Sequence, residues 1–431
     1  MRNDCHTRAI SRVTRGPIVP LILVLGMLSA CGHPKEPDEH GALRQELTDS
    51  LTLLAQQADF NGFGVVLVNE DTVLYQNGFG MANIVTQEKY TEHTLQAIAS
   101  ISKTFIGIAV LKAQEMGKLK LDDPIDSYLP FTVRNPYYPE VPITIRHLVT
   151  HTSTINDTVN YYEEAYIIHH SVDVPEGLRL DISPCRFSPP NADVPMEKFL
   201  RERLSANGKR YLKGGFLPRR PGELYNYSNM GATLAALVLE KATGTPFDAF
   251  IKQYILDPLG MKASGEGLGM VDVSKHSKLY LSDRKRSYPL YTCITYPDGS
   301  LITSTEDMAK YMVELMRGHQ GKGNLLSQAS YAEYFRPQLQ AENFLERNAE
   351  NVYNDEYNMG ITMGFSAKGY FGHTGGDPGM FSMMFFNEAT GLGRYMIVNT
   401  DMDNWAMHAR IWSLLERYGE RLNTAPSLGS L

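Results

Sequence analysis

A serine and a lysine three residues apart stand at the start of the most apolar helical stretch of the sequence. Ser100 and Lys103 begin a predicted helix over residues 101–116. Side chains three residues apart share one face of a helix, so the Lys103 amine can reach the Ser100 hydroxyl. A serine hydroxyl is a weak nucleophile until a base removes its proton, and a lysine can do so where burial keeps part of it neutral. The pair therefore predicts a nucleophile and its base.

The spacing alone is weak evidence, because the sequence contains a second pair of the same kind. Ser282 and Lys285 are also three residues apart, but they lie in a highly charged stretch without an apolar helical pattern. A serine that caps a helix beside a solvated lysine is the ordinary structural alternative for any single pair. The apolar context favours Ser100 over Ser282.

A second motif, Tyr227-Ser228-Asn229, comes just before another helical stretch, 230–243. A tyrosine hydroxyl there could carry a proton from Ser100 to a leaving group. An asparagine amide could hold both Lys103 and a substrate carbonyl. By itself, the motif would be an ordinary turn and helix start.

A third motif consists of His373, Thr374, Gly375 and Gly376 on a predicted strand. Glycines on a strand let a substrate backbone approach closely, and an exposed amide there can complete an oxyanion hole. A glycine-rich turn is the structural alternative.

In this order, the three motifs resemble the signature motifs of the serine β-lactamases and penicillin-binding proteins, which are SxxK, then Ser or Tyr-x-Asn, then Lys or His-Thr-Gly. The tyrosine of the second motif is most similar to the class C β-lactamases and their esterase and D-peptidase relatives. The similarity continues through 143–153, 257–261 and 298–311, and it spans about residues 43–420.

The resemblance implies a role for each site residue. Ser100 would form an acyl-enzyme, Lys103 would take its proton, and Tyr227 would act as an acid and then as a base for the attacking water. Asn229 would orient the substrate and the lysine. The amides of Ser100 and Gly376 would surround the oxyanion.

The resemblance also implies an α/β (α+β) fold. An antiparallel sheet flanked by helices would join an all-helical domain, with the active site in the crevice between them. Hydrophobic periodicity predicts sheet and helix at both chain ends independently. The expected helices cover 43–54 and 405–418, and the expected strands cover 64–68, 72–75, 380–386 and 394–399.

We therefore expect a sheet domain over 41–121 and 299–425 and a mainly helical domain over 122–298. The tract 155–221 is rich in tyrosine and proline and is long for a connection. It could form a lid or pocket wall, or equally a passive surface excursion.

The N-terminal residues predict export. Arginines precede an apolar stretch, 18–28, that is shorter than the roughly 20 residues of a spanning helix, so 1–30 is expected to be a signal peptide. Leu28-Ser29-Ala30-Cys31 is similar to a bacterial lipobox, which implies a lipid on Cys31, a tether over 31–40 and a membrane-anchored protein facing the periplasm. An ordinary signal peptide with an incidental Cys31 is the alternative.

Composition excludes several classes of partner. The formal charge of −7 without a basic run argues against nucleic acid, and no phosphate-binding glycine loop or other cofactor motif is present. His151 and the pair His169-His170 lack the companions of a metal site. Cys185 and Cys293 could pair or remain thiols, and nothing in the sequence fixes an oligomeric state.

His373 stands where many relatives carry a lysine that attracts a substrate carboxylate. A histidine with an ordinary pKa near 6.5 is mostly neutral at pH 7, although a neighbour such as Asp377 could restore its charge. We therefore expect a serine hydrolase acting on esters or amides without that acid group. The alternatives are a β-lactamase or D-amino-acid peptidase acting on cell-wall peptides, and a non-catalytic lipoprotein that binds a cell-wall ligand.

Overall fold

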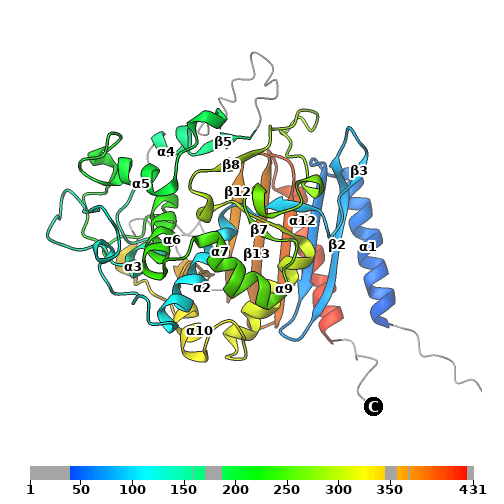
Figure 1. Ribbon diagram of the computed structural model, residues 1–431. Helices are drawn as coiled ribbons and strands as arrows, with labels where there is room; N and C mark the ends of the chain where they lie inside the picture. Colours follow the sequence, from blue (N-terminus) through cyan, green and yellow to red (C-terminus); the bar gives the residue numbers. More distant parts are fainter. Residues whose placement is uncertain (1–38, 158, 170–186, 345–356, 367–368, 425–431) are drawn as a thin grey trace, which may run out of the picture. The chain divides into compact units, whose positions relative to one another are not determined.

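An antiparallel sheet organises the computed structural model, which describes residues 39–157, 159–169, 187–344, 357–366 and 369–424. Among these residues, eight strands form a sheet in the order β10-β11-β12-β13-β14-β1-β2-β3, so both ends of the chain build its centre (Figure 1). All neighbouring pairs are antiparallel. The strands are β1 Gly62–Val68, β2 Val73–Asn83, β3 Glu88–Lys89, β10 Tyr357–Met359, β11 Gly364–Ser366, β12 Tyr370–Asp377, β13 Met380–Asn387 and β14 Leu392–Val398.

The central strands are apolar on both faces because helices cover both sides of the sheet. Along β1, Phe63, Val65 and Leu67 belong to one hydrophobic cluster, whereas Val66 and Val68 belong to another. Successive side chains of a strand point to opposite faces, so the alternation assigns one cluster to each face. The first cluster includes residues of α1 (Glu39–Gln57) and α12 (Ala406–Thr424), which lie side by side in Figure 1.

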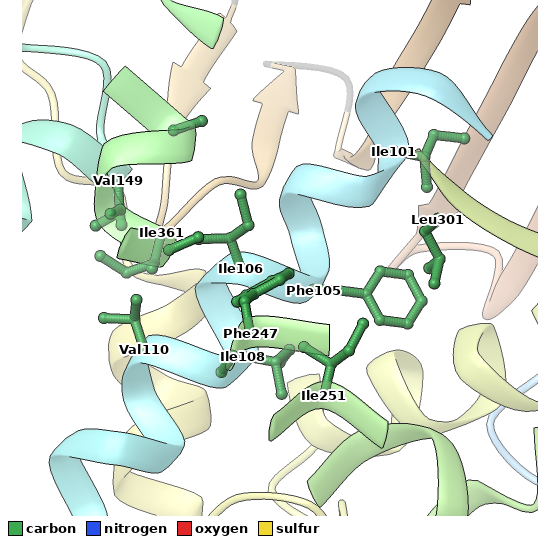
Figure 2. Close-up of a cluster of buried hydrophobic side chains, with 14 of the residues drawn as sticks. Ile101, Phe105, Ile106, Ile108, Val110, Val149, Phe247, Ile251, Leu301 and Ile361 are labelled. Atoms are coloured by element: carbon green, nitrogen blue, oxygen red, sulfur yellow. The ribbon is translucent and has the colours of Figure 1, made fainter. Parts of the chain in front are cut away.

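The other face packs against α9 (Thr305–His319). The hydrophobic cluster on this face also contains α2 (Ser102–Glu115), a helix buried on nearly all sides. Figure 2 shows Phe105, Ile106 and Ile108 of α2 among side chains from distant segments, including Phe247 and Ile251. A helix that is apolar all round is stable only inside a core. This core fixes the start of α2, where the predicted nucleophile lies.

The middle of the chain supplies most of the remaining helices. Two smaller three-stranded sheets, with orders β4-β9-β7 and β6-β5-β8, accompany them in the described residues. The short strands did not show in the sequence pattern, because two or three residues are too few for an alternation. The α-helices are α3 Ile145–Val149, α4 Val159–Glu164, α5 Met196–Leu204, α6 Asn229–Thr243, α7 Phe247–Ile251, α8 Asp257–Leu259, α9 Thr305–His319 and α10 Gln328–Phe335. The short strands are β4 Leu95–Ala97, β5 Tyr166–Ile168, β6 Phe187–Ser188, β7 Gly265–Glu266, β8 Tyr291–Cys293 and β9 Leu301–Ser304.

The fold prediction is confirmed: an antiparallel sheet carries helices on both faces. The described residues belong to one compact unit, Glu39–Leu431, and its division into a sheet domain and a helical domain stays a prediction. Part of the 155–221 tract, as well as Cys31 and Cys185, lies outside the described residues. Among the described helices, none has the length and apolar character needed to cross a membrane.

Candidate active site

The predicted nucleophile lies in a tight helical turn at the entrance of α2. Ser100 is the middle residue of a 3₁₀ turn, η1 (Ala99–Ile101), which continues directly into α2. Ala99 has a φ of 49°, a left-handed conformation that costs energy for any residue with a side chain. One helical turn further, Lys103 Nζ donates a hydrogen bond to Ser100 Oγ at 3.1 Å. The structure therefore places the amine of the SxxK pair on the serine hydroxyl.

The Lys103 side chain is completely buried, with 0% exposure. Its ammonium also donates to the carbonyl oxygen of Asp298 at 2.7 Å and lies 3.9 Å from Asp298 Oδ1. Burial lowers the pKa of Lys103 below its usual 10.5, while Asp298 and then Asp377 oppose the shift. Burial thus favours the neutral amine that a base requires, and the nearby carboxylates favour the charged form.

Asp298 is itself held from two sides. It ends the 3₁₀ turn η8 (Tyr296–Asp298), and its carboxylate accepts hydrogen bonds from Thr233 Oγ1 at 2.9 Å and from the Tyr161 hydroxyl at 3.1 Å. Burial raises the pKa of Asp298, and Lys103 lowers it. Asp298 and Lys103 thus each shift the pKa of the other, and Lys103 in turn contacts Ser100.

Tyr227 completes the group around the lysine. Lys103 Nζ lies 5.1 Å from the centre of the Tyr227 ring. The phenol oxygen is buried and makes no hydrogen bond of normal geometry within the described part of the chain. Burial raises the pKa of Tyr227 well above 10, and the nearby Ser100 hydroxyl lowers it by a smaller amount. The phenol is therefore protonated at neutral pH.

The loop that carries Tyr227 is fixed by residues far away in the sequence. Asp157 accepts hydrogen bonds from Ser228 Oγ at 2.8 Å and from the backbone N–H of Asn229 at 2.6 Å, at the start of α6. A carboxylate at a helix N-terminus satisfies amides that have no partner within the helix. His151 Nδ1 accepts from the Ser228 N–H at 3.2 Å, and its ring packs against Tyr227 with centroids 4.5 Å apart.

The third motif lies on β12, directly against the nucleophile. A side-chain carbon added at Gly375 would lie 2.4 Å from the Ile98 carbonyl oxygen and 3.0 Å from the Ser100 amide nitrogen. Only a glycine lets the strand come this close. Gly376 is exposed, and a carbon added there would meet only Phe381 Cδ2, at 3.8 Å. The Gly376 N–H comes directly after Gly375, the residue that lies against the Ser100 amide.

His373 is buried, with 6% exposure. Its Nδ1 donates to the Thr374 carbonyl oxygen at 2.5 Å, which leaves Nε2 as the acceptor nitrogen of the neutral ring. Burial and, to a smaller extent, the charge of Lys103 lower the pKa of His373 to about 4. The histidine is therefore neutral at pH 7, and the third motif carries no positive charge.

Two carboxylates, Asp298 and Asp377, act on Lys103. Asp377 ends β12 and accepts a hydrogen bond from the Tyr166 hydroxyl at 2.6 Å. Burial raises the pKa of Asp377 to about 7. Together with Asp298, this residue makes the surroundings of Lys103 acidic rather than basic.

The structure brings Ser100, Lys103, Tyr227 and Gly375 together. It does not link the Asn229 side chain to Lys103, since no hydrogen bond joins them in the described residues. The competing Ser282 lies in an exposed turn outside any helix. Three residues that support the site were missed from the sequence: Asp157, Asp298 and His151, for which only a metal-binding role was considered and rejected. No local signal marks the first, which acts on a helix that begins 72 residues later.

Comparisons with known proteins identify the family of the chain. A family profile described as Beta-lactamase matches residues 47–418. A penicillin-binding protein of Bacillus subtilis is 27% identical over 79% of the chain and 68% of that protein. The esterase EstB of Burkholderia gladioli is 28% identical, over 47% of the chain and 46% of that protein.

A solved structure of a β-lactamase/D-alanine carboxypeptidase from Yersinia pestis has the same fold, with a TM-score of 0.65 and 18% identity over 89% of this chain and 99% of that chain. A D-amino acid amidase from Ochrobactrum anthropi gives a TM-score of 0.61, with 18% identity over 89% and 100% of the two chains. The family match covers most of the sequence and contains all three motifs. The chain therefore belongs to the Beta-lactamase family and is an enzyme of the serine hydrolase type.

Proposed function

We propose that this enzyme hydrolyses esters or amides that carry no carboxylate next to the scissile bond, through an acyl group on Ser100. The observation that carries the substrate class is the neutral His373 in a site whose other titratable groups include Asp298 and Asp377. A substrate carboxylate would find no positive partner on β12 and would face two acids. Uncharged acyl donors avoid this repulsion.

The proton path follows from the contacts. Neutral Lys103 accepts the proton of Ser100 as the hydroxyl attacks the carbonyl carbon, and the Ser100 and Gly376 amides stabilise the oxyanion. The protonated Tyr227 phenol gives its proton to the leaving group and recovers one from Lys103. In deacylation, the protons move in the reverse direction. Tyr227 takes a proton from the attacking water as it passes its own to Lys103, and Lys103 returns a proton to the Ser100 oxygen.

Substrate choice tests this proposal through a matched pair of esters. We expect 3-acetoxybenzoate to react at least about tenfold more slowly, in kcat/KM, than its methyl ester, because only the former places a carboxylate in the site. His373→Lys restores a positive charge and is expected to narrow that ratio by about tenfold. Equal rates for the two esters in the wild type would contradict the proposed substrate class. Rapid turnover of benzylpenicillin would point to the β-lactamase alternative.

The pH dependence tests the role of Lys103. If the neutral amine is the base, kcat/KM rises with pH through the Lys103 pKa. Asp298 raises that pKa, so Asp298→Asn is expected to move the acidic limb of the profile about one unit lower. Asp377→Asn should shift the limb in the same direction by less, because Asp377 is the smaller cause. An acidic limb that stays in place in both variants would exclude Lys103 as the titrating base.

We also propose that the protein is exported and anchored through a lipid on Cys31. The support is the arrangement of arginines, the apolar stretch and Leu28-Ser29-Ala30-Cys31. Mass spectrometry of the mature protein tests the proposal: an N-terminal Cys31 with a diacylglycerol mass supports it, and an unmodified chain contradicts it.

A further inference from the structure

An acidic cavity lies beside the turn η8, whose Asp298 contacts Lys103. It has a volume of about 530 Å³ and is formed by segments around α5, α7, β7 and β8, which are labelled in Figure 1. Tyr296, at the beginning of η8, lines the cavity, whereas Asp298, at the end of the same turn, contacts Lys103. The cavity is thus separate from the catalytic group, although it shares a structural element with it.

The notable side chain in this cavity is Glu266. It is only 6% exposed, and neither carboxylate oxygen has a hydrogen-bond partner in the described part of the chain. A buried carboxylate without partners is strongly disfavoured. The charged groups that act on Glu266 are Asp248 and Asp298, which are both acids, so its pKa is raised well above 4.5 by burial and then by them. Nothing described in the protein compensates this acid.

The other residues that line the cavity indicate what kind of ligand could pair with the Glu266 carboxylate. Asp193 and Asp248 add two further acids, and no lysine or arginine is among the described lining residues. Apolar and aromatic side chains make up much of the remaining wall: Val194, Met196, Leu268, Ile294 and Tyr296. An ammonium group can pair with a carboxylate and lie against an aromatic ring, while a short hydrocarbon body covers the apolar wall.

A metal ion fits this cavity less well. Calcium requires six to eight oxygen ligands around one point. The described residues contain no group of three or more histidine, cysteine, aspartate or glutamate side chains placed to hold a metal. We propose that the cavity binds a small organic ammonium ion, with its nitrogen on the Glu266 carboxylate and its hydrocarbon part against Met196 and Ile294.

The test uses the full-length protein and n-hexylammonium as the probe, with hexan-1-ol as the uncharged analogue. Isothermal titration calorimetry at pH 8 is expected to show saturable binding of hexylammonium and at least about tenfold weaker binding of the alcohol. Glu266→Gln, which keeps the size of the side chain, is expected to weaken amine binding at least about tenfold. Asp248→Asn, on a half-buried residue, serves as a second variant should Glu266→Gln not fold, and should weaken binding by a smaller factor.

Ser100→Ala separates this site from the catalytic site, because it is expected to leave hexylammonium binding unchanged. Binding that is lost in Ser100→Ala, or kept at full affinity in both acid variants, would overturn the proposal. So would equal affinity for amine and alcohol, the absence of any saturable amine binding, or a preference for calcium chloride over the amine.

Discussion

Replacing Ser100 by alanine is expected to reduce hydrolysis of a neutral nitrophenyl ester by about 10⁴-fold or more, close to the uncatalysed rate. Lys103 and β12 both contact Ser100. The Lys103 amine donates to the Ser100 hydroxyl at 3.1 Å, and Gly375 of β12 lies against the Ser100 backbone amide. Lys103→Met should cost a similar factor, since the serine then has no base. The measurement is kcat/KM of each purified variant.

The double variant gives the sharper result. Residues that act as one unit show losses that do not add, so Ser100→Ala combined with Lys103→Met should be no slower than either single variant. Ser282→Ala is the matched control, because Ser282 belongs to the other SxxK sequence and lies in an exposed turn. Full activity in Ser100→Ala, or a loss in Ser282→Ala, would assign the nucleophile to a different serine.

The sequence predicted this pair well because its geometry is local. Ser100 and Lys103 are one helical turn apart, and the apolar pattern of α2 identifies the helix without any tertiary information. The strands near the two chain ends were predicted for a related reason, since nearly continuous apolar runs such as β1 are typical of sheets covered on both faces. Their assembly into one antiparallel sheet was expected only from the family resemblance, and the pairing of β1 with β14 was not predicted.

The supporting residues could not be predicted because they act over long sequence separations. Ser228 already caps α6 locally, since its Oγ accepts a hydrogen bond from the Gly231 N–H at 2.9 Å. The sequence therefore gives no indication that Asp157 also binds the start of this helix. The same holds for Asp298, which meets Lys103 only after the chain has folded. The charge of His373 could not be predicted from the sequence either. Its pKa falls to about 4 mainly because the side chain is buried, and burial depends on the tertiary structure.

The contact between β12 and the nucleophile predicts the second large effect. Gly375→Ala would place a carbon 2.4 Å from the Ile98 carbonyl oxygen, 2.6 Å from Ser382 Oγ and 3.0 Å from the Ser100 amide nitrogen. Two of these atoms belong to the backbone and cannot turn aside, so the strand must move away from Ser100. The Ser100 amide on η1 and the Gly376 amide on β12 would then lie too far apart to stabilise the same oxyanion. We expect kcat to fall by about 10²- to 10³-fold.

Gly376→Ala is the matched comparison, because it makes the same chemical change one residue further along the strand. The added carbon meets only Phe381 Cδ2 at 3.8 Å, and the Gly376 amide is retained. We expect its loss of kcat to be at least about tenfold smaller than that of Gly375→Ala. Thermal unfolding of both variants separates a displaced strand from a destabilised protein: Gly375→Ala should lose far more activity than its melting temperature explains. Equal activity of the two variants would show that the approach of β12 to Ser100 does not matter for catalysis, and the two-amide oxyanion hole would then have to be abandoned.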